Sequence, residues 1–299
     1  MDILVVGSIA LDTIETPYGS VKDSPGGSAL YFSSAASLFA PVNIVGVVGD
    51  DFNFEHIKFL QKRKINLEGI YTDKGKTFRW GGRYYKNLNR RDTLFTHLNV
   101  FENFRPMIPD FYKKSQIVFL ANIAPDLQLQ VLNQIEKPHL VVLDTMNFWI
   151  NGYRSELLKV IQRCDVLILN DEETRELSED DNLITAGNMI LDMGPKFLII
   201  KKGEHGAVLI GKNIYFAAPA FPLIKVVDPT GAGDSFAGGF VGFLAKMRKF
   251  NEEKMRKALV YGNIMASFNV EDFSFRNLIS LNMEKLEIRY KQYKQFTHY

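Results

Sequence analysis

The sequence has 299 residues, 46% hydrophobic and 23% charged, which is an ordinary composition for a globular protein. Its 36 basic and 34 acidic residues leave a net charge of +2, so charge does not favour binding to nucleic acid or to a membrane surface. Cys164 is the single cysteine, which excludes an internal disulfide, and we expect its thiol to be buried. No apolar stretch reaches the length of a membrane helix, and the first seven residues lack the basic start of a signal peptide. The sequence therefore predicts a cytoplasmic enzyme.

Apolar runs alternate with helical patterns along most of the chain. Residues 3–6 form a continuous apolar run, typical of a strand covered on both faces. Further strands are expected at 42–48, 117–121, 140–143, 166–169 and 197–200, with helices at 52–64, 127–135, 155–162, 183–193 and 283–290. This alternation predicts an α/β fold with a mainly parallel sheet, in which ligands bind at the carboxyl ends of the strands. Candidate site residues are those that follow strands: Asp12, Asp50, Asp144, Asn170 and Asp228.

Two stretches break the alternation and predict a small β-layer that acts as a lid over the site. The first covers residues 12–22 and the second residues 67–98, where strands are expected at 69–72, 77–85 and 93–98. Both lid segments are expected to be inserted in a single domain of residues 1–299.

The second lid segment is strongly basic. Between Lys74 and Arg91 it carries seven basic residues and no acid. They are Lys74, Lys76, Arg79, Arg83, Lys86, Arg90 and Arg91. A solvated hairpin with charged edges accounts for them. The alternative is that some of the arginines contact an anionic substrate.

The stretch from Asp228 to Phe240 has the strongest functional signal in the chain. It predicts a strand at 224–227, then a glycine-rich turn, then a buried helix that starts near Ser235. Gly231 and Gly233 let backbone N–H groups face a ligand, and the start of a helix adds unpaired donors and a positive dipole end. Together these features predict an anion site, most often used for phosphate. Asp234 adds a carboxylate beside this site, suited to take a proton from an attacking hydroxyl.

The segment Asp228-Pro-Thr-Gly-Ala-Gly-Asp-Ser-Phe236 resembles the C-terminal signature of the PfkB family of carbohydrate and nucleoside kinases. The resemblance extends in order over nearly the whole chain and implies a three-layer αβα ribokinase-like fold with a small β lid. It implies that Asp234 is the catalytic base. It also implies that Gly231, Ala232 and Gly233 form the anion hole for the transferred phosphoryl group.

The resemblance also implies a nucleotide site for ATP and Mg²⁺. Asn170 to Glu173 match the Asn-x-x-Glu motif, in which the asparagine lies near the phosphates and the glutamate holds Mg²⁺ through water. An N-cap asparagine with acids in the first turn of a helix is the structural alternative, and it is compatible with this role. Lys201, Gly203 and Gly206 match a strand-turn along the nucleotide, and Asn263 matches an adenine-side asparagine.

On the acceptor side, Asp12 matches the aspartate that grips sugar hydroxyls, and Gly26-Gly27 match the di-glycine hinge. Many members of the family also bind K⁺, to which Asp228 and Thr230 would contribute. The family's sugar-binding asparagine after the two glycines is replaced by Tyr31, which argues against the common sugar substrates.

These observations predict an ATP-dependent kinase that phosphorylates a hydroxyl of a small carbohydrate. A nucleoside kinase of adenosine-kinase type is the alternative, because the lid aromatics Phe78, Trp80, Tyr84 and Tyr85 are able to stack on a base. A non-catalytic sugar- or nucleotide-binding regulator is a further alternative of another class. We expect a small-molecule substrate, no nucleic-acid or membrane partner, and a homodimer formed through the lid.

Overall fold

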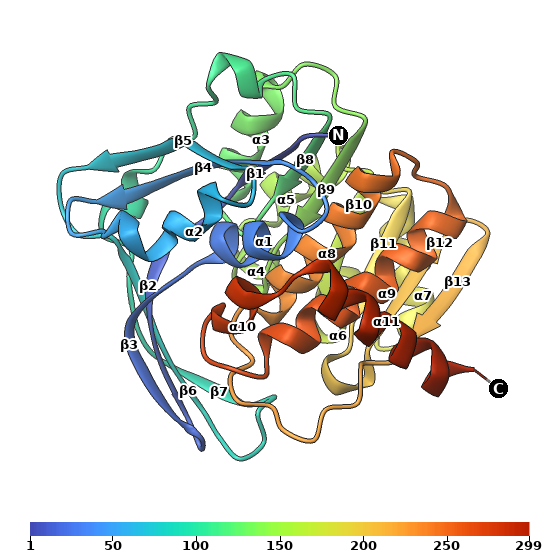
Figure 1. Ribbon diagram of the computed structural model, residues 1–299. Helices are drawn as coiled ribbons and strands as arrows, with labels where there is room; N and C mark the ends of the chain where they lie inside the picture. Colours follow the sequence, from blue (N-terminus) through green and yellow to red (C-terminus); the bar gives the residue numbers. More distant parts are fainter. Residues whose placement is uncertain (299) are drawn as a thin grey trace.

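The structure is a computed structural model that describes residues 1–298. Within this range the largest element is a nine-stranded sheet with the order β13-β12-β11-β10-β9-β8-β1-β4-β5 (Figure 1). The strands from β11 to β5 run parallel, and β12 and β13 add an antiparallel edge. The strands are β1 (Ile3–Val6), β4 (Val42–Gly49), β5 (Ile65–Asp73), β8 (Ile117–Leu120), β9 (Leu140–Asp144), β10 (Val166–Asn170), β11 (Phe197–Lys201), β12 (Ala207–Gly211) and β13 (Ile214–Ala218).

Helices cover both faces of this sheet, because successive side chains of each buried strand point to opposite faces. Ile3 and Val5 of β1 belong to one apolar cluster and Leu4 and Val6 to the other, all fully buried. The first cluster packs against α1 (Ser28–Ala36), α8 (Ala232–Met247), α9 (Glu252–Asn269), α10 (Arg276–Ser280) and α11 (Met283–Thr297). The second packs against α3 (Pro125–Gln134), α4 (Asn147–Gly152), α5 (Arg154–Ile161), α6 (Asp171–Ser178) and α7 (Leu183–Asp192). The predicted three-layer αβα arrangement is confirmed.

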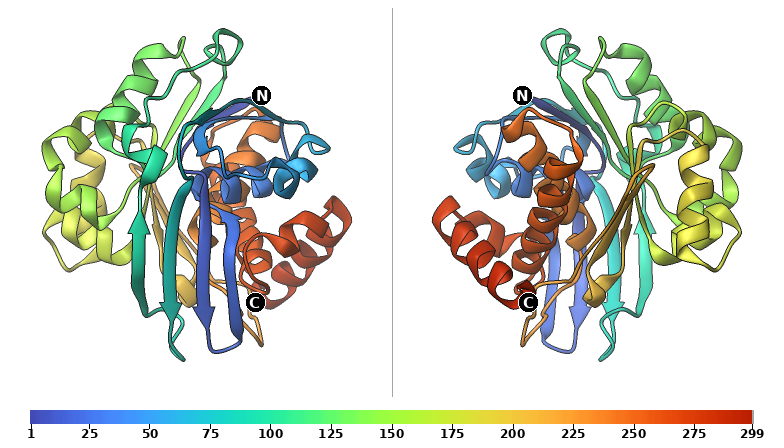
Figure 2. Two further views of the ribbon diagram at one scale, coloured as in Figure 1. Left: turned by 90° about the vertical axis from the view of Figure 1, so that its left-hand side faces the viewer. Right: turned by 90° about the vertical axis from the view of Figure 1, so that its right-hand side faces the viewer.

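A second sheet, the lid, projects from the main sheet (Figures 1 and 2). Its order is β3-β2-β6-β7, built from β2 (Ala10–Thr16), β3 (Gly19–Gly26), β6 (Phe78–Tyr84) and β7 (Arg91–His97). The prediction that the second lid segment begins at residue 67 is wrong. Residues 65–73 are β5, which pairs with β4 at the edge of the main sheet, so the lid part starts only at Phe78.

Three other expectations are corrected by the structure. Residues 224–227 form no strand: Val227 N–H donates to the Val270 carbonyl, and Ile224 is fully exposed. The helix expected at 52–64 is a 3₁₀ turn (Phe54–Ile57) and the short α2 (Lys58–Gln61), since Lys64 turns into β5 with φ 60°. The third difference is the β12–β13 hairpin, because the sequence analysis expected a turn at 201–206 and no strand at 207–218.

One expectation from composition is confirmed. Cys164 is buried, at 5% exposure. In the part of the chain that the structure describes, no helix is both long and apolar enough to cross a membrane.

Candidate active site

Most of the predicted site residues lie around one cavity of about 320 Å³, between the carboxyl ends of the main strands, the lid and the start of α8. The predicted residues that line it are Asp12, Gly27, Tyr31, Asp144, Asn170, Glu173, Lys201, Thr230, Gly231, Ala232, Gly233 and Asp234. They come from six separate regions of the sequence. The fold therefore assembles the site at the sheet edge where parallel α/β proteins bind ligands.

The anion site is formed by the turn that precedes α8. Gly231 has φ 73°, a left-handed conformation that disfavours a side chain, and a Cβ there would lie 2.3 Å from the ring of Tyr31. The ring of Tyr31 thus packs against the turn at Gly231. Its hydroxyl is buried and has no hydrogen-bond partner among residues 1–298. No protein acceptor is found in this range for the N–H groups of Gly231 and Gly233. These free donors at the start of a 16-residue helix fit an anion.

Asp234 lies in the first turn of α8 and lines the same cavity. Burial and the neighbouring carboxylate of Asp144 raise its pKa to about 7, although Lys201 and Arg91 act in the opposite direction. A carboxylate with a pKa near neutrality is matched to a general base at physiological pH.

Lys201 supplies the positive charge beneath the anion site. Its Nζ lies 3.4 Å from Asp144 Oδ1, and a Cβ added to Gly233 would lie 3.1 Å from the same nitrogen. Burial lowers the pKa of Lys201, but the carboxylates of Asp144 and Glu173 outweigh it and raise the pKa overall. Lys201 is therefore charged and placed beside the turn, where it can balance a bound phosphate.

Asn170 and Glu173 form a reciprocal cap at the start of α6. The Glu173 N–H donates to Asn170 Oδ1 at 2.7 Å, and the Asn170 N–H donates to Glu173 Oε2 at 2.7 Å. This geometry is compatible both with a helix cap and with the expected role at Mg²⁺. Only Oε2 of Glu173 takes part in the cap, so Oε1 is able to accept a water. Burial raises the pKa of Glu173 to about 7.

In the described chain no group of three or more His, Cys, Asp or Glu side chains is arranged to hold a metal by itself. Mg²⁺ bound through one or two carboxylates together with substrate phosphates does not require such a group. Glu173 is one of the acids that line the cavity.

Asp12 lies on lid strand β2 and is 4% exposed. Burial and the charge of Asp228 raise its pKa to about 8. A Cβ on Gly26 would lie 1.9 Å from Asp12 Oδ2, and one on Gly27 would lie 2.5 Å from the Ser8 carbonyl. The two glycines therefore let the lid strand pass close to the body, which places the Asp12 carboxyl at the wall of the cavity.

Asp228 and Thr230 brace the turn. The two oxygens of Asp228 accept N–H groups of Thr230 at 2.9 Å and Ser274 at 3.0 Å. Thr230 Oγ1 is hydrogen-bonded to the hydroxyl of Tyr84 from the lid at 3.1 Å. This last contact ties the lid to the signature turn.

Six predicted residues do not line the cavity. Asp228 braces the turn, as described above, and Asp50 is exposed and accepts the Gly75 N–H at 3.4 Å. Gly203 and Gly206 lie in the turn after β11, both with positive φ, and the side chain of Asn89 from the lid hairpin lies close to Gly203. The Asn263 amide donates to the carbonyls of Ala218 and Pro219, and so secures the end of β13. Gly26 acts through Asp12, as described above.

Three arginines of the basic lid segment, Arg79, Arg83 and Arg91, differ in their partners. Arg79 is paired with Asp23 and Asp51, and Arg83 with Glu15, so both are occupied by lid and body carboxylates. Arg91 instead lines the cavity, with its guanidinium 5.3 Å from the centre of the Trp80 ring. Phe78 and Trp80 line the cavity as well, whereas Tyr85 is exposed.

The model of the pfkB family of carbohydrate kinases matches residues 1–280 of this chain. The chain belongs to the pfkB family. It is 28% identical to the cytidine kinase of Thermococcus kodakarensis, over 84% of this chain and 91% of that one. It is also 28% identical to a nucleoside kinase of Methanocaldococcus jannaschii, over 90% of each. A solved putative ribokinase II of Escherichia coli, in complex with ATP and Mg²⁺, superposes with a TM-score of 0.78 at 19% identity, covering 97% of this chain and 99% of that chain.

As a member of the pfkB family, the protein is a phosphotransferase that acts on an alcohol group. The regulator alternative is therefore set aside.

Sequence reasoning missed the wall of the cavity formed by Asn122, Thr145 and Met146. Asn122 follows β8, and Thr145 and Met146 follow β9. The rule used for the other strands, that polar residues just after a parallel strand reach the site, would have found Asn122.

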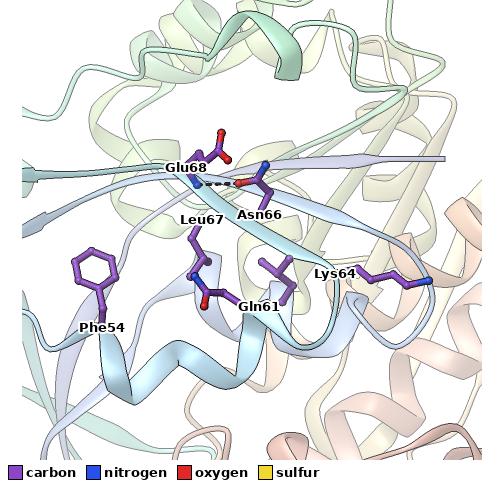
Figure 3. A pocket seen from close by; sticks show the side chains of 7 residues that line it. Phe54, Gln61, Lys64, Asn66, Leu67 and Glu68 are labelled. Atoms are coloured by element: carbon purple, nitrogen blue, oxygen red, sulfur yellow. Dashed lines mark hydrogen bonds between the residues drawn. The ribbon is translucent and has the colours of Figure 1, made fainter.

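A second, larger hollow of about 560 Å³ lies at the sheet edge beside β5 (Figure 3). It is an open groove lined by Phe54, Gln61, Lys64, Ile65, Asn66, Leu67 and Glu68. None of the predicted site residues lines it. It lacks the clustered acids of the first cavity, and neither Lys201 nor the start of α8 reaches it. The smaller cavity is thus the candidate active site.

Proposed function

We propose that this kinase transfers the γ-phosphoryl group of ATP to a hydroxyl of a nucleoside, with Asp234 as the catalytic base. The observation that carries the choice of acceptor is the lining of the cavity. Phe78 and Trp80 from the lid offer flat aromatic surfaces for a base, in the same cavity as Asp12, which can grip ribose hydroxyls. The names of the two curated relatives, a cytidine kinase and a nucleoside kinase, support the same class of acceptor.

In this proposal Asp12 orients the acceptor and Asp234 removes the proton of the attacking hydroxyl. The free N–H groups of Gly231 and Gly233, with Lys201, stabilise negative charge on the group in transfer. Glu173 and Asn170 would hold hydrated Mg²⁺ and the nucleotide phosphates. When bound, ATP supplies the phosphoryl group and Mg²⁺ screens its charge. Transfer of this kind depends mostly on positioning and electrostatics, and the cavity gathers groups for both.

Asp234→Asn tests the base. The substitution keeps the shape of the side chain but removes its ability to accept a proton, so kcat should fall by roughly 10²–10⁴-fold. The dissociation constant for ATP, measured by calorimetry, should stay within about twofold. The matched control is Asp126→Asn, an exposed acid in the first turn of α3, which should keep full activity. Undiminished turnover by Asp234→Asn would remove Asp234 from this role.

A panel of acceptors tests the substrate class. ATP turnover is measured with Mg²⁺ for cytidine, uridine, adenosine and inosine, and for ribose, fructose and their phosphates. The proposal expects kcat/KM for at least one nucleoside to exceed that of every free sugar. A free sugar as the preferred acceptor would restore the carbohydrate-kinase hypothesis, which Asp12 supports equally well because sugars and nucleosides both carry the hydroxyls that a carboxylate binds.

Three further expectations from the sequence stay predictions: activation by K⁺ near Asp228 and Thr230, pairing of two subunits through the lid, and a cytoplasmic location. For K⁺, the Asp228 carboxylate already accepts two backbone N–H groups, so a cation there would be held mainly by carbonyl oxygens. A KCl titration against NaCl at constant ionic strength tests this.

A further inference from the structure

The cavity has one wall that the proposed catalytic roles leave unused, formed by Asn122 and the loop after β9. Strand order places this wall on the acceptor side. β8, which ends just before Asn122, pairs with β1, whereas the nucleotide residues Asn170 and Lys201 end β10 and β11. Asn122 is therefore separated from those nucleotide residues by β9. It lies on the side of the cavity that Ser8 and Asp12 form.

The orientation of the Asn122 amide is fixed by Trp149. The indole Nε1–H donates to Asn122 Oδ1 at 2.9 Å. An indole can only donate, so the oxygen of the amide must face Trp149 and the NH₂ group must face away from it. Trp149 in turn packs edge-on against Phe148 on α4 and Tyr153 just after it, with ring centres 4.8 and 5.2 Å apart. The aromatic cluster thus opposes rotation of the amide.

The NH₂ group has spare hydrogen-bonding capacity. Asn122 Nδ2 donates to Met146 Sδ at 3.1 Å, and a thioether is a weak acceptor. Its second hydrogen has no acceptor among residues 1–298. The neighbouring Thr145 hydroxyl, on a residue 3% exposed that lines the same cavity, also has no partner in this range. Unpaired polar groups of this kind in a cavity wall are expected to bind a ligand atom.

We propose that Asn122, held in place by Trp149, determines acceptor specificity by donating a hydrogen bond to an oxygen of the acceptor substrate. This inference rests on the proposed function, and the oxygen it favours is a carbonyl of a pyrimidine base. A ring amino group at the same place would oppose the amide hydrogens and would be rejected, because two donors would then face each other. Asn122 is a specificity-determining residue and Trp149 is a positioning residue.

Asn122→Asp is the decisive variant. It keeps the acceptor for the Trp149 N–H but places a carboxylate oxygen where the donor was. The acceptor KM should rise at least about tenfold, while the KM for ATP and the melting temperature stay close to those of the unchanged enzyme. Trp149→Phe should raise the acceptor KM less, because the amide remains but is free to turn. The control is Asn151→Ala, which removes an amide on α4 that is bonded to Glu176 and lies outside the cavity, and should change neither KM.

Substrate analogues identify the oxygen. With the unchanged enzyme, 2-thiocytidine should show a higher KM than cytidine, since sulfur accepts hydrogen bonds weakly. The ratio of these two KM values should approach one in Asn122→Asp. If it is instead the KM ratio of 2′-deoxycytidine or 3′-deoxycytidine to cytidine that approaches one in this variant, the oxygen belongs to the ribose. An unchanged acceptor KM in Asn122→Asp overturns the inference. If the unchanged enzyme accepts only sugars, the proposed function fails, and the same KM comparison with that sugar still decides the role of Asn122.

Discussion

Arg91 shows how one residue of a charged segment is distinguished from its neighbours. The sequence presents seven basic residues between Lys74 and Arg91 with no way to rank them. The structure pairs Arg79 and Arg83 with carboxylates and leaves Arg91 at the cavity, where its charge lowers the pKa of Asp234. Arg91 therefore both favours the ionised form of the proposed base and can bind a phosphate through two N–H groups.

Arg91→Lys keeps the charge but loses the bidentate geometry. If Arg91 contacts the group in transfer, kcat should fall by roughly 10–100-fold, the loss expected from one hydrogen bond to a charged group. Steady-state kinetics with saturating acceptor measures it. Arg83→Lys, on the same lid sheet and paired with Glu15, serves as the control and should change kcat less than about twofold. Equal effects of the two substitutions would mean that Arg91 acts only through the lid fold.

At the scale of elements, the lid and the signature turn are joined by a buried contact. Tyr84 on β6 is 6% exposed, packs with Ile14 and Phe273, and has its hydroxyl 3.1 Å from Thr230 Oγ1. Burial raises the pKa of Tyr84, so the phenol remains protonated, and its oxygen accepts a hydrogen bond from the Thr230 hydroxyl. The lid is thus held against the turn at the start of α8 by a buried hydrogen bond.

Tyr84→Phe removes this hydrogen bond and retains the packing of the ring. The free energy of unfolding should fall by about 0.5–1.5 kcal/mol, with a higher KM for the acceptor because the lid closes less firmly. Thermal unfolding and steady-state kinetics check the two effects. Tyr85→Phe is the matched control, since that exposed hydroxyl contacts only the lid residue Asp92. A rise in acceptor KM of the same size in both variants would argue against a role for the Thr230 contact.

The elements also show what could be predicted from the sequence. Buried parallel strands such as residues 3–6 and 166–170 were predictable, because a strand covered on both faces is continuously apolar. The signature turn was predictable because glycines and an acid at fixed spacing have few other uses. Residues 67–73 were misassigned to the lid because pairing with β4 is a long-range choice that local pattern does not encode. Asn122 could have been predicted from its place just after a strand, but its hydrogen bond from Trp149, 27 residues away in the chain, could not.

At the scale of the whole molecule, the site places several buried acids close together. The pKa of Asp12 is raised to about 8, and those of Glu173 and Asp234 to about 7, in each case mainly by burial. In the unfolded chain these groups titrate near 4. Between these values the folded state holds protons that the unfolded state has lost, so stability decreases as pH rises from about 4 to about 8.

The ligand-free enzyme should therefore melt several degrees lower at pH 8 than at pH 5, measured by differential scanning fluorimetry in buffers of equal ionic strength. Asp12→Asn, which removes the acid with the highest of these pKa values, should flatten this slope. A melting temperature that rises across this window in both proteins would show that other groups dominate the pH dependence of stability.

The single cysteine has a practical consequence for studying the lid. Cys164 is buried beneath α5, and burial raises its pKa, so its thiol is a poor nucleophile at neutral pH. A cysteine introduced at an exposed position of the hairpin between β6 and β7, such as Asn87, would then be the one thiol open to a fluorescent label. The natural protein thus needs no prior removal of cysteines before lid movement is followed by optical spectroscopy.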